Sequence, residues 1–324
     1  MVSYAGERKG TKVAVKMLRI HRSRRIRLLY EQGVIWPTLR HPHILPVLGF
    51  IRDSLEETPT MLDCSFVVPW LRHGNILTRL SSMEHQEHMP PFSDWLKQII
   101  SGIKYLHEEQ LVHGSLRGSN VLIDENNVVK LADYGTSPYV EDEHDECGAL
   151  NGVEMSRWMA PEKLSLDLDQ VFIPSPQHDI YAFGCLWIEL HSRRPPFPDY
   201  TDHLASLQVL KGSTPQLPSQ GLIPPVTTDQ LQSQPIWRIV RQCLSTAPEM
   251  RPSIHDLEST LDTDTYWIRQ AYSDPASKTP GKLPDAVRVR AAAEHRTKEG
   301  GGSSIWGIVR TKWRWLYNVF EPRF

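Results

Sequence analysis

Several polar side chains stand close together in the stretch LVHGSLRGSNVLID, which covers residues 111–124. Arg117 and Asn120 lie within it, and Asp133 follows in the phrase ADYG. A guanidinium group can hold a phosphate or a carboxylate, and amide and carboxylate oxygens suit a hard cation such as magnesium. The stretch also contains Ser115, whose hydroxyl is not a base near neutral pH. These residues can therefore hold an anion and a cation, but Ser115 is not suited to accept a proton.

The composition is that of an ordinary soluble globular protein. The chain has 324 residues with 40% hydrophobic and 23% charged residues, and its formal net charge is −2. Its length allows one large or two modest domains to bury a core, and the near-zero charge argues against bulk nucleic-acid binding. The four cysteines include no CxxC pair, which favours a reducing compartment over a disulfide framework or a zinc site. No apolar stretch of about 18 residues and no secretory signal is evident.

The pattern of apolar residues changes along the chain from mainly β to mainly α. TKVAVKML alternates like a strand that contains Lys16, and HPHILPVLGFI and SFVVPWL also predict strands. Residues 21–36 predict a helix with Trp36 on its apolar face, and Pro37 ends it. From residue 92 the helical period predicts a helix with Ser93 as its N-cap and an apolar face made of Trp95, Leu96, Ile99, Ile103 and Leu106.

Six phrases together carry a family resemblance. They are VAVK (13–16), HGSLRGSN (113–120), DYG (133–135), APE (160–162), DIYAFGCLWIEL (179–190) and CLSTAPEMRPSI (243–254). In this order and approximate spacing they resemble a eukaryotic-type protein kinase domain over about residues 2–262. Two further phrases, VVPWLRHGNIL and HPHILPVLGF, are most similar to fungal kinase-like proteins and plant receptor-like kinases.

The resemblance implies roles for the polar residues. Lys16 matches the lysine that holds the α- and β-phosphates of ATP, and Arg117 stands where a lysine usually contacts the γ-phosphate. Asn120 and Asp133 match the two magnesium ligands. The hinge would be VPWL, where Val68 lines the adenine site, Pro69 offers its carbonyl and Leu71 its amide. The expected cofactors are therefore ATP and Mg²⁺, both weakly bound.

The same resemblance marks three departures from an active kinase. The residue five positions before Asn120 accepts the proton of the attacking hydroxyl in the family, and here it is Ser115. The helix position that should carry a glutamate partner for Lys16 is Gln32, with Glu31 one position earlier and about 100° around the helix. No GxGxxG precedes Lys16, so we expect an incomplete small lobe or a shortened start.

Other matches imply structural roles. Glu162 and Arg251 match the ion pair that ties the activation segment to the helical lobe, and Asp179 matches the aspartate that anchors the catalytic loop. His113 matches a histidine that props this loop, which favours a packed structural role over acid–base chemistry.

The sequence therefore predicts an α+β, bilobal protein-kinase-like fold over residues 1–262, with a β-rich N-lobe at 1–69 and a helical C-lobe at 72–262. The favoured function is a pseudokinase in intracellular signalling, with weak or no phosphotransfer. One alternative is an active Ser/Thr or Tyr kinase with an atypical catalytic loop, which an upstream glycine-rich segment would favour. A second is an interaction platform targeted by its tail, which membrane binding by the tail would favour. The expected partners are signalling proteins or a protein substrate, in the cytoplasm.

The residues after 262 differ in composition. Residues 263–302 are rich in Pro, Gly, Ser and Lys and predict a linker. Residues 303–324 predict a Trp-rich amphipathic helix. In 303–320 apolar residues fall near one face, and Arg310, Arg314 and, at the edge, Lys312 add positive charge. Such a segment can lie on an anionic membrane surface or pack on its own kinase lobe.

Overall fold

A computed structural model provides the coordinates of the chain, and it describes residues 2–8, 10–21, 36–52, 61–83, 92–135, 156–165, 175–216 and 235–262. The chain divides into two units, Met1–Gly281 and Lys282–Phe324, and every described residue belongs to the first. Of the helix predicted at 21–36, residues 22–35 with Gln32 and Glu31 lie outside the described residues, as do the predicted linker and the predicted tail helix. Its two ends are not α-helical, because His21 ends a strand and Trp36 begins a 3₁₀ turn.

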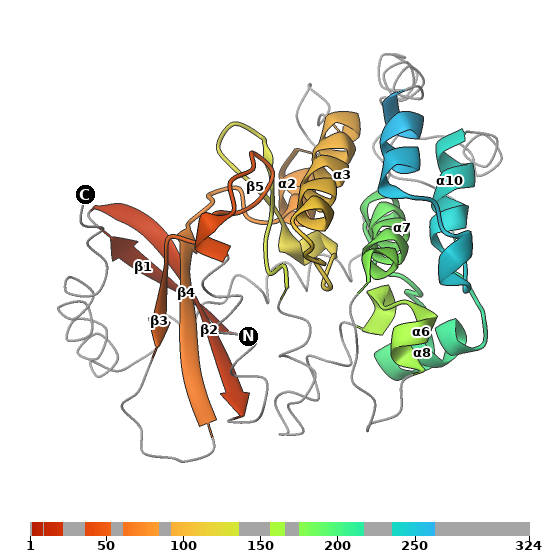
Figure 1. Ribbon diagram of the computed structural model, residues 1–324, viewed down its shortest axis with the longest axis horizontal. Coiled ribbons are helices and arrows are strands. Elements are labelled where there is room, and N and C mark those ends of the chain that lie inside the picture. Colours follow the sequence, from red (N-terminus) through yellow and green to blue (C-terminus); the bar gives the residue numbers. More distant parts are fainter. Residues whose placement is uncertain are drawn as a thin grey trace. The chain divides into compact units, whose positions relative to one another are not determined.

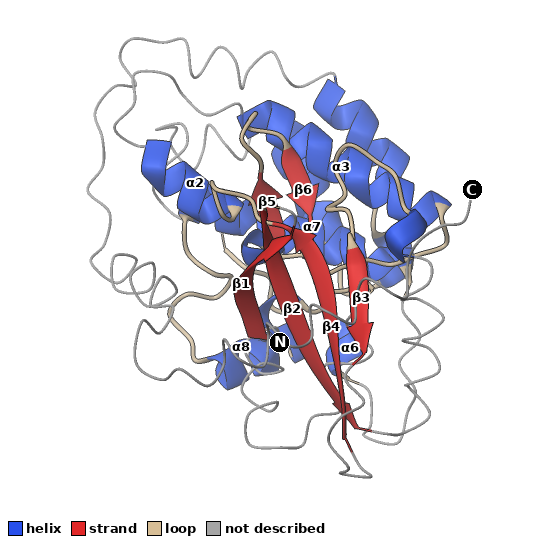
Figure 2. Cartoon of the chain, turned by 90° about the vertical axis from the view of Figure 1, so that its left-hand side faces the viewer, coloured by secondary structure: helices blue, strands red, loops and turns tan. Residues whose placement is uncertain are grey.

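The N-terminal part is a four-stranded antiparallel sheet with the order β1-β2-β4-β3, seen face-on in Figure 2. Its strands are β1 (Val2–Arg8), β2 (Thr11–His21), β3 (Gly49–Arg52) and β4 (Met61–Pro69). A tight turn joins β1 to β2, and Gly10 in this turn has a φ of 77°, which glycine adopts without steric cost. The register places Lys16 on β2 opposite Phe66 on β4.

The remaining elements are mainly helical (Figure 1). They begin with the 3₁₀ turn η1 (Trp36–Thr38), α2 (Ile76–Met83) and α3 (Phe92–Glu108). The turn η2 (Gly118–Asn120) leads into a small antiparallel pair, β5 (Val121–Ile123) and β6 (Val129–Leu131). There follow η3 (Ser156–Trp158), α6 (Pro161–Leu164), α7 (Pro176–Ser192), α8 (Asp202–Leu210), α10 (Pro235–Cys243), η4 (Pro248–Met250) and a helix over 254–262.

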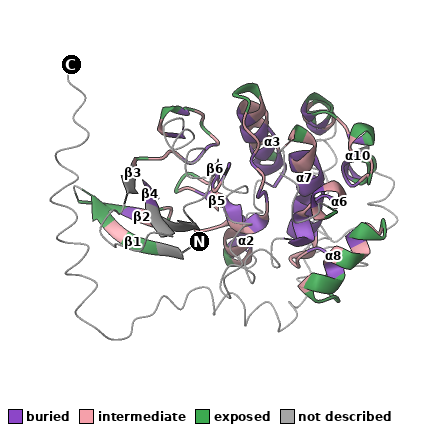
Figure 3. Cartoon of the chain, turned by 60° about the horizontal axis from the view of Figure 1, so that its bottom comes forward, coloured by how far each residue is buried: buried purple, intermediate pink, exposed green. Residues whose placement is uncertain are grey.

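The core lies among the helices, where Figure 3 shows the buried faces of α3 and α7. The predicted apolar face of α3 is confirmed, because each of its five residues is fully buried. α7 is buried on all sides from Asp179 to His191, as expected of a central helix. A Cβ atom on Gly184 of α7 would lie 3.0 Å from Cys243 on α10, so glycine allows these two helices to approach closely.

Two sequence predictions need correction. Ser93 is not the N-cap of α3, because the helix begins at Phe92 and both residues are buried within its first turn. The stretch 41–51 is a strand only from Gly49, while Ile44 makes an isolated bridge to Leu131. The preceding residues instead turn back on themselves, since the Ile44 amide donates to the His41 carbonyl. The predicted α+β arrangement, a small β-rich lobe before a larger helical lobe, is confirmed.

Among the described residues, none of the helices combines the length and the apolar character that a membrane span requires.

Candidate active site

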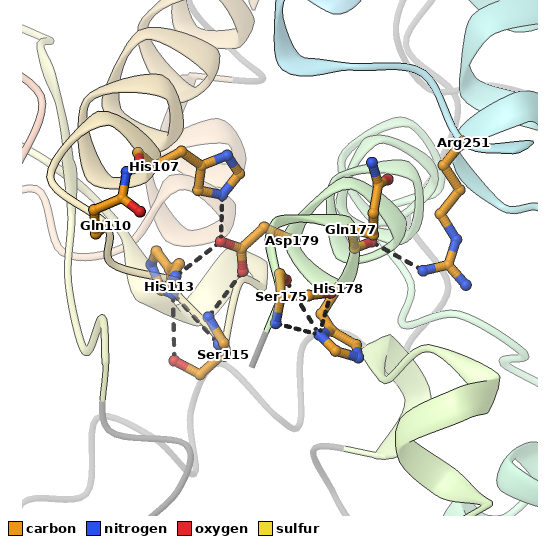
Figure 4. A network of polar contacts seen from close by, with 10 residues as sticks. His107, Gln110, His113, Ser115, Ser175, Gln177, His178, Asp179 and Arg251 are labelled. Atoms are coloured by element: carbon orange, nitrogen blue, oxygen red, sulfur yellow. Dashed lines mark hydrogen bonds and ion pairs between the residues drawn. The ribbon is translucent and has the colours of Figure 1, made fainter. Parts of the chain in front are cut away.

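Asp179, the fourth residue of α7, holds the loop that carries Ser115 (Figure 4). Its carboxylate accepts hydrogen bonds from the backbone amides of His113 and Gly114, both at 2.8 Å, and from the His107 ring at 2.9 Å. Burial alone would raise the pKa of Asp179, but the hydrogen bond from His107 and the nearby histidines hold that pKa below its ordinary value. The carboxylate therefore stays charged and fixes the backbone of the loop.

His113 is a packed residue of this loop. Its side chain is fully buried, and burial lowers the pKa of its ring. Its backbone carbonyl accepts from the Gly135 amide at 2.9 Å, which joins the loop to the DYG segment. This environment agrees with the structural role predicted for His113.

Ser115 links the two residues that the sequence predicts as magnesium ligands. Its hydroxyl donates to the backbone carbonyl of Asp133 at 2.7 Å, and the Asn120 side-chain amide donates to the Ser115 carbonyl at 2.7 Å and to its Oγ at 3.3 Å. Only 8% of Ser115 is exposed. The hydroxyl proton therefore points to a carbonyl, and the side chain serves as a bridge within the site.

Lys16 reaches this site from the sheet. Its ammonium group lies 2.5 Å from Asp133 Oδ1, and the two side chains are 15% and 19% exposed. Asp133 has a φ of 60°, in the left-handed region that non-glycine residues seldom adopt. Such backbone strain persists where the surrounding contacts impose it. The hydrogen bond from Ser115 to the Asp133 carbonyl and the ion pair between Lys16 and the Asp133 carboxylate therefore hold this residue in place.

The hinge residues border a small apolar cluster. Val68 is buried with Leu45 and Ala132, and half-buried Ala14, Val47, Leu71 and Leu122 pack against them. Pro69 closes β4 opposite Val13, and it has no N–H to donate. Half-buried apolar side chains beside the hinge backbone suit a planar aromatic ring.

These residues fit a magnesium nucleotide. The apolar cluster would hold the adenine ring, Lys16 would hold phosphates, and Asn120 and Asp133 would hold the metal, which keeps part of its water shell in such sites. A bound nucleotide would supply the phosphoryl group. Within the described residues, no three His, Cys, Asp or Glu side chains form a metal cluster.

Arg117 lies over the ring of Trp158, with its guanidinium carbon 6.0 Å from the ring centre. The Trp158 indole donates to Glu189 Oε2 at 2.9 Å, and the Gly118 amide donates to the same oxygen at 2.9 Å. Buried Glu189 on α7 thus joins the catalytic loop to η3. The sequence analysis missed Glu189 and Trp158, because nothing in their local pattern indicates this long-range pairing.

A set of aromatic rings connects the loop to the sheet. Tyr134 lies between His113, at 6.5 Å between ring centres, and Trp36, at 6.1 Å. Trp36 in turn contacts Phe66 at 4.6 Å, edge to face. Sequence reasoning assigned Trp36 only to a helix face, yet it is a buried residue of η1 that supports the DYG segment. Aromatic contacts of this kind fix the relative positions of the elements that carry them.

The predicted ion pair between Glu162 and Arg251 is present. Both guanidinium ends of Arg251 lie 2.7 Å from the Glu162 carboxylate, and the Arg251 side chain is fully buried. His178 on α7 lies 3.3 Å from the same carboxylate. Burial lowers the pKa of His178, although the charge of Glu162 opposes this shift. Burial would raise the pKa of Glu162, but the hydrogen bonds and the charge of Arg251 hold that pKa below its ordinary value.

The structure thus brings Lys16, Ser115, Asn120 and Asp133 together, with Arg117 on the same loop and Val68, Pro69 and Leu71 at the hinge. Their catalytic and binding roles stay predictions. A family model for protein tyrosine and serine/threonine kinases matches residues 2–261.

Proposed function

The chain belongs to the protein tyrosine and serine/threonine kinase family, and from this premise we propose that it is a pseudokinase. It binds ATP weakly at best, in a magnesium-dependent manner, and transfers phosphate far more slowly than an ordinary kinase. It acts in the cytoplasm through contacts with signalling proteins, and not through turnover.

The observation that carries this proposal is the state of Ser115. An attacking hydroxyl must lose a proton in the transition state, and a positioned base contributes about 10²–10⁴-fold to such a step. The Ser115 hydroxyl is a poor base, and its proton is already donated to the Asp133 carbonyl at 2.7 Å. The Asn120 amide also contacts its oxygen at 3.3 Å. The residue thus supports the positions of Asn120 and Asp133 and does not itself supply a proton acceptor for the attacking group.

Another observation favours a second candidate, an active kinase with an atypical catalytic loop. Lys16 and Asp133 form a close ion pair at 2.5 Å, and Asp179 holds the loop backbone. Phosphoryl transfer depends largely on positioning and on charge neutralisation, so a well-placed nucleotide could react slowly with a hydroxyl that solvent deprotonates. A third candidate, a platform targeted by residues 303–324, rests on the tail sequence alone.

Radiolabelled ATP with generic peptide substrates separates the first two candidates. We expect the parent protein to turn over at or below about 10⁻² s⁻¹, at least about a hundredfold below the slow end of the usual kinase range of about 1–100 s⁻¹. Ser115→Asp should not restore a normal rate, because it also removes the hydroxyl that donates to Asp133. A parent rate of about 1 s⁻¹ or more that Lys16→Met abolishes would mean that the protein is an active enzyme.

Nucleotide binding needs its own measurement. Magnesium ATP should raise the melting temperature of the parent slightly, as any ligand of the folded state does, and Lys16→Met should remove this shift. Lys12→Met, on the same strand but exposed, is the matched control and should keep it.

A further inference from the structure

A pocket of about 220 Å³ lies where α3 meets the helix over 254–262 and the turn at 41–44. Its described lining residues include His43 of the turn, Gln98, Ile100 and Ser101 of α3, and Leu261 of the last helix. A cavity of about 150 Å³ is large enough to bind benzene, so this pocket has room for a ligand of one or two rings. None of its described lining residues belongs to the candidate active site.

Two ion pairs fix the helices on either side of the pocket, which Figure 1 shows next to each other. Lys97 on α3 lies 2.7 Å from Asp262, and Lys104, two turns further along α3, lies 2.9 Å from Glu258. The charged residues that line the pocket, Lys97, Glu258 and Asp262, thus each have an opposite charge beside them. A pocket whose charges are already paired suits a neutral ligand.

The backbone of Val129 on β6 determines which polar groups two of the lining residues present. Its amide donates to Gln98 Oε1 at 2.8 Å, and its carbonyl accepts from His43 Nδ1 at 3.4 Å. Because a backbone amide only donates, its partner is the Gln98 oxygen, and the NH₂ group of Gln98 is left over. His43 uses Nδ1 as a donor, so Nε2 of the neutral ring is an acceptor.

These two remaining groups are available to a ligand. Among the described residues, neither the NH₂ group of Gln98 nor Nε2 of His43 has a hydrogen-bond partner. Burial lowers the pKa of His43, although the hydrogen bond to the Val129 carbonyl opposes this shift, so the ring is neutral near pH 7. The pocket therefore presents a donor and an acceptor next to each other, with Ile100 and Leu261, each 1% exposed, as its apolar wall.

We propose that this pocket binds a small neutral aromatic amide. The amide N–H would donate to His43 Nε2, the amide carbonyl would accept from the NH₂ group of Gln98, and the ring would pack on Ile100 and Leu261. Few polar groups that fix the orientation of an otherwise apolar ligand are typical of small-molecule sites. The inference goes beyond the proposed function and does not depend on it, because the pocket shares no described residue with the nucleotide site.

Ligand-observed NMR titration of the full-length chain with benzamide tests the proposal. We expect a dissociation constant of about 1 mM or below, as suits so small a ligand. N,N-dimethylbenzamide has no N–H for His43, and benzoate carries a charge, so both should bind at least about tenfold more weakly.

Two variants place the ligand in this pocket. Gln98→Glu keeps an oxygen for the Val129 amide but removes the donor, and should weaken benzamide binding about tenfold or more. Its matched control is Gln242→Glu, an exposed residue of α10, which should bind like the parent. Ser101→Met fills the pocket with a larger side chain and should abolish binding, whereas Ser82→Met, exposed on α2, should not.

The melting temperature of each variant shows whether it folds, and if one does not, the other decides. The proposal is overturned if benzamide does not bind at about 10 mM or if N,N-dimethylbenzamide binds equally well. It is also overturned if a folded pocket variant binds benzamide as its control does, because the ligand would then lie elsewhere, for example at the hinge. The phosphotransfer rate is measured separately, so failure here leaves the proposed function unaffected.

Discussion

The buried side chain of His191 allows a test of how burial changes a pKa and, through it, the stability of the fold. It lies in the last turn of α7, is 1% exposed and stacks on Trp187 with 4.1 Å between ring centres. Phe92 contacts it edge to face at 5.5 Å, and neither ring nitrogen has a hydrogen-bond partner among the described residues. Burial, with a smaller contribution from the charge of Arg193, lowers the pKa of His191 from 6.5 to about 3.

The pH dependence follows from this shift. Between about pH 6.5 and about pH 3 the unfolded chain binds a proton at His191 and the folded protein does not, so the free energy of unfolding falls as the pH falls. At about pH 5, about 1.5 pH units below the unfolded pKa, the loss amounts to about 2 kcal/mol, at 1.36 kcal/mol for each unit. Above about pH 7.5 the ring is neutral in both states and the loss vanishes.

The variant His191→Phe should remove this part of the pH dependence, since a phenyl ring can keep the contacts with Trp187 and Phe92. Urea denaturation at about pH 7.5 and about pH 5 measures the effect. The parent should lose about 2 kcal/mol more than the variant between these values. Other buried histidines, such as His113, contribute equally to both proteins and cancel in the comparison.

His203→Phe is the matched control, because His203 is exposed on α8, and its pH dependence should follow that of the parent. If His191→Phe loses as much stability as the parent on acidification, the ring is not held neutral by burial, and the reasoning fails.

Two further predictions concern other parts of the chain. Glu162→Gln should lower the free energy of unfolding by about 3–5 kcal/mol, because it leaves the fully buried Arg251 without its counter-charge. Urea denaturation measures this loss. A loss below about 1 kcal/mol, as for an exposed pair, would contradict the prediction. The full chain should co-sediment with anionic liposomes through residues 303–320, and Trp313→Glu should abolish this; a parent protein that stays in the supernatant would remove the membrane proposal.

Much of the architecture could be predicted from local pattern. The apolar face of α3 repeats with helical period, and all of its predicted members are buried. The ordered phrases identify the loop, the Lys16 strand and the Glu162–Arg251 pair, because each depends on residue identity at a fixed place. The Ser93 error arose because a polar residue before an apolar run resembles an N-cap, although Phe92 already begins the helix and is buried.

The contacts within the site could not be read from the sequence. The hydroxyl of Ser115 bonds a backbone carbonyl that lies 18 residues later in the chain, and backbone groups carry no sequence signal. The same holds for Glu189, whose partners Gly118 and Trp158 are 71 and 31 residues away. The apolar spacing before Pro37 predicts a helix face that includes Trp36. The contact of Trp36 with Tyr134 could not be predicted in this way, because it depends on the tertiary packing between distant segments.

These contacts explain why the loop keeps its shape without a carboxylate at position 115. Its backbone is fixed by Asp179 through the amides of His113 and Gly114, which do not depend on any side chain of the loop. Ser115 has a neutral hydroxyl where an aspartate would carry a charge. This hydroxyl donates to the Asp133 carbonyl and so holds Asp133 against Lys16. An aspartate at this position could not donate that bond near neutral pH. The geometry for binding and the chemistry of proton transfer therefore rest on different groups, and the second can be lost while the first remains.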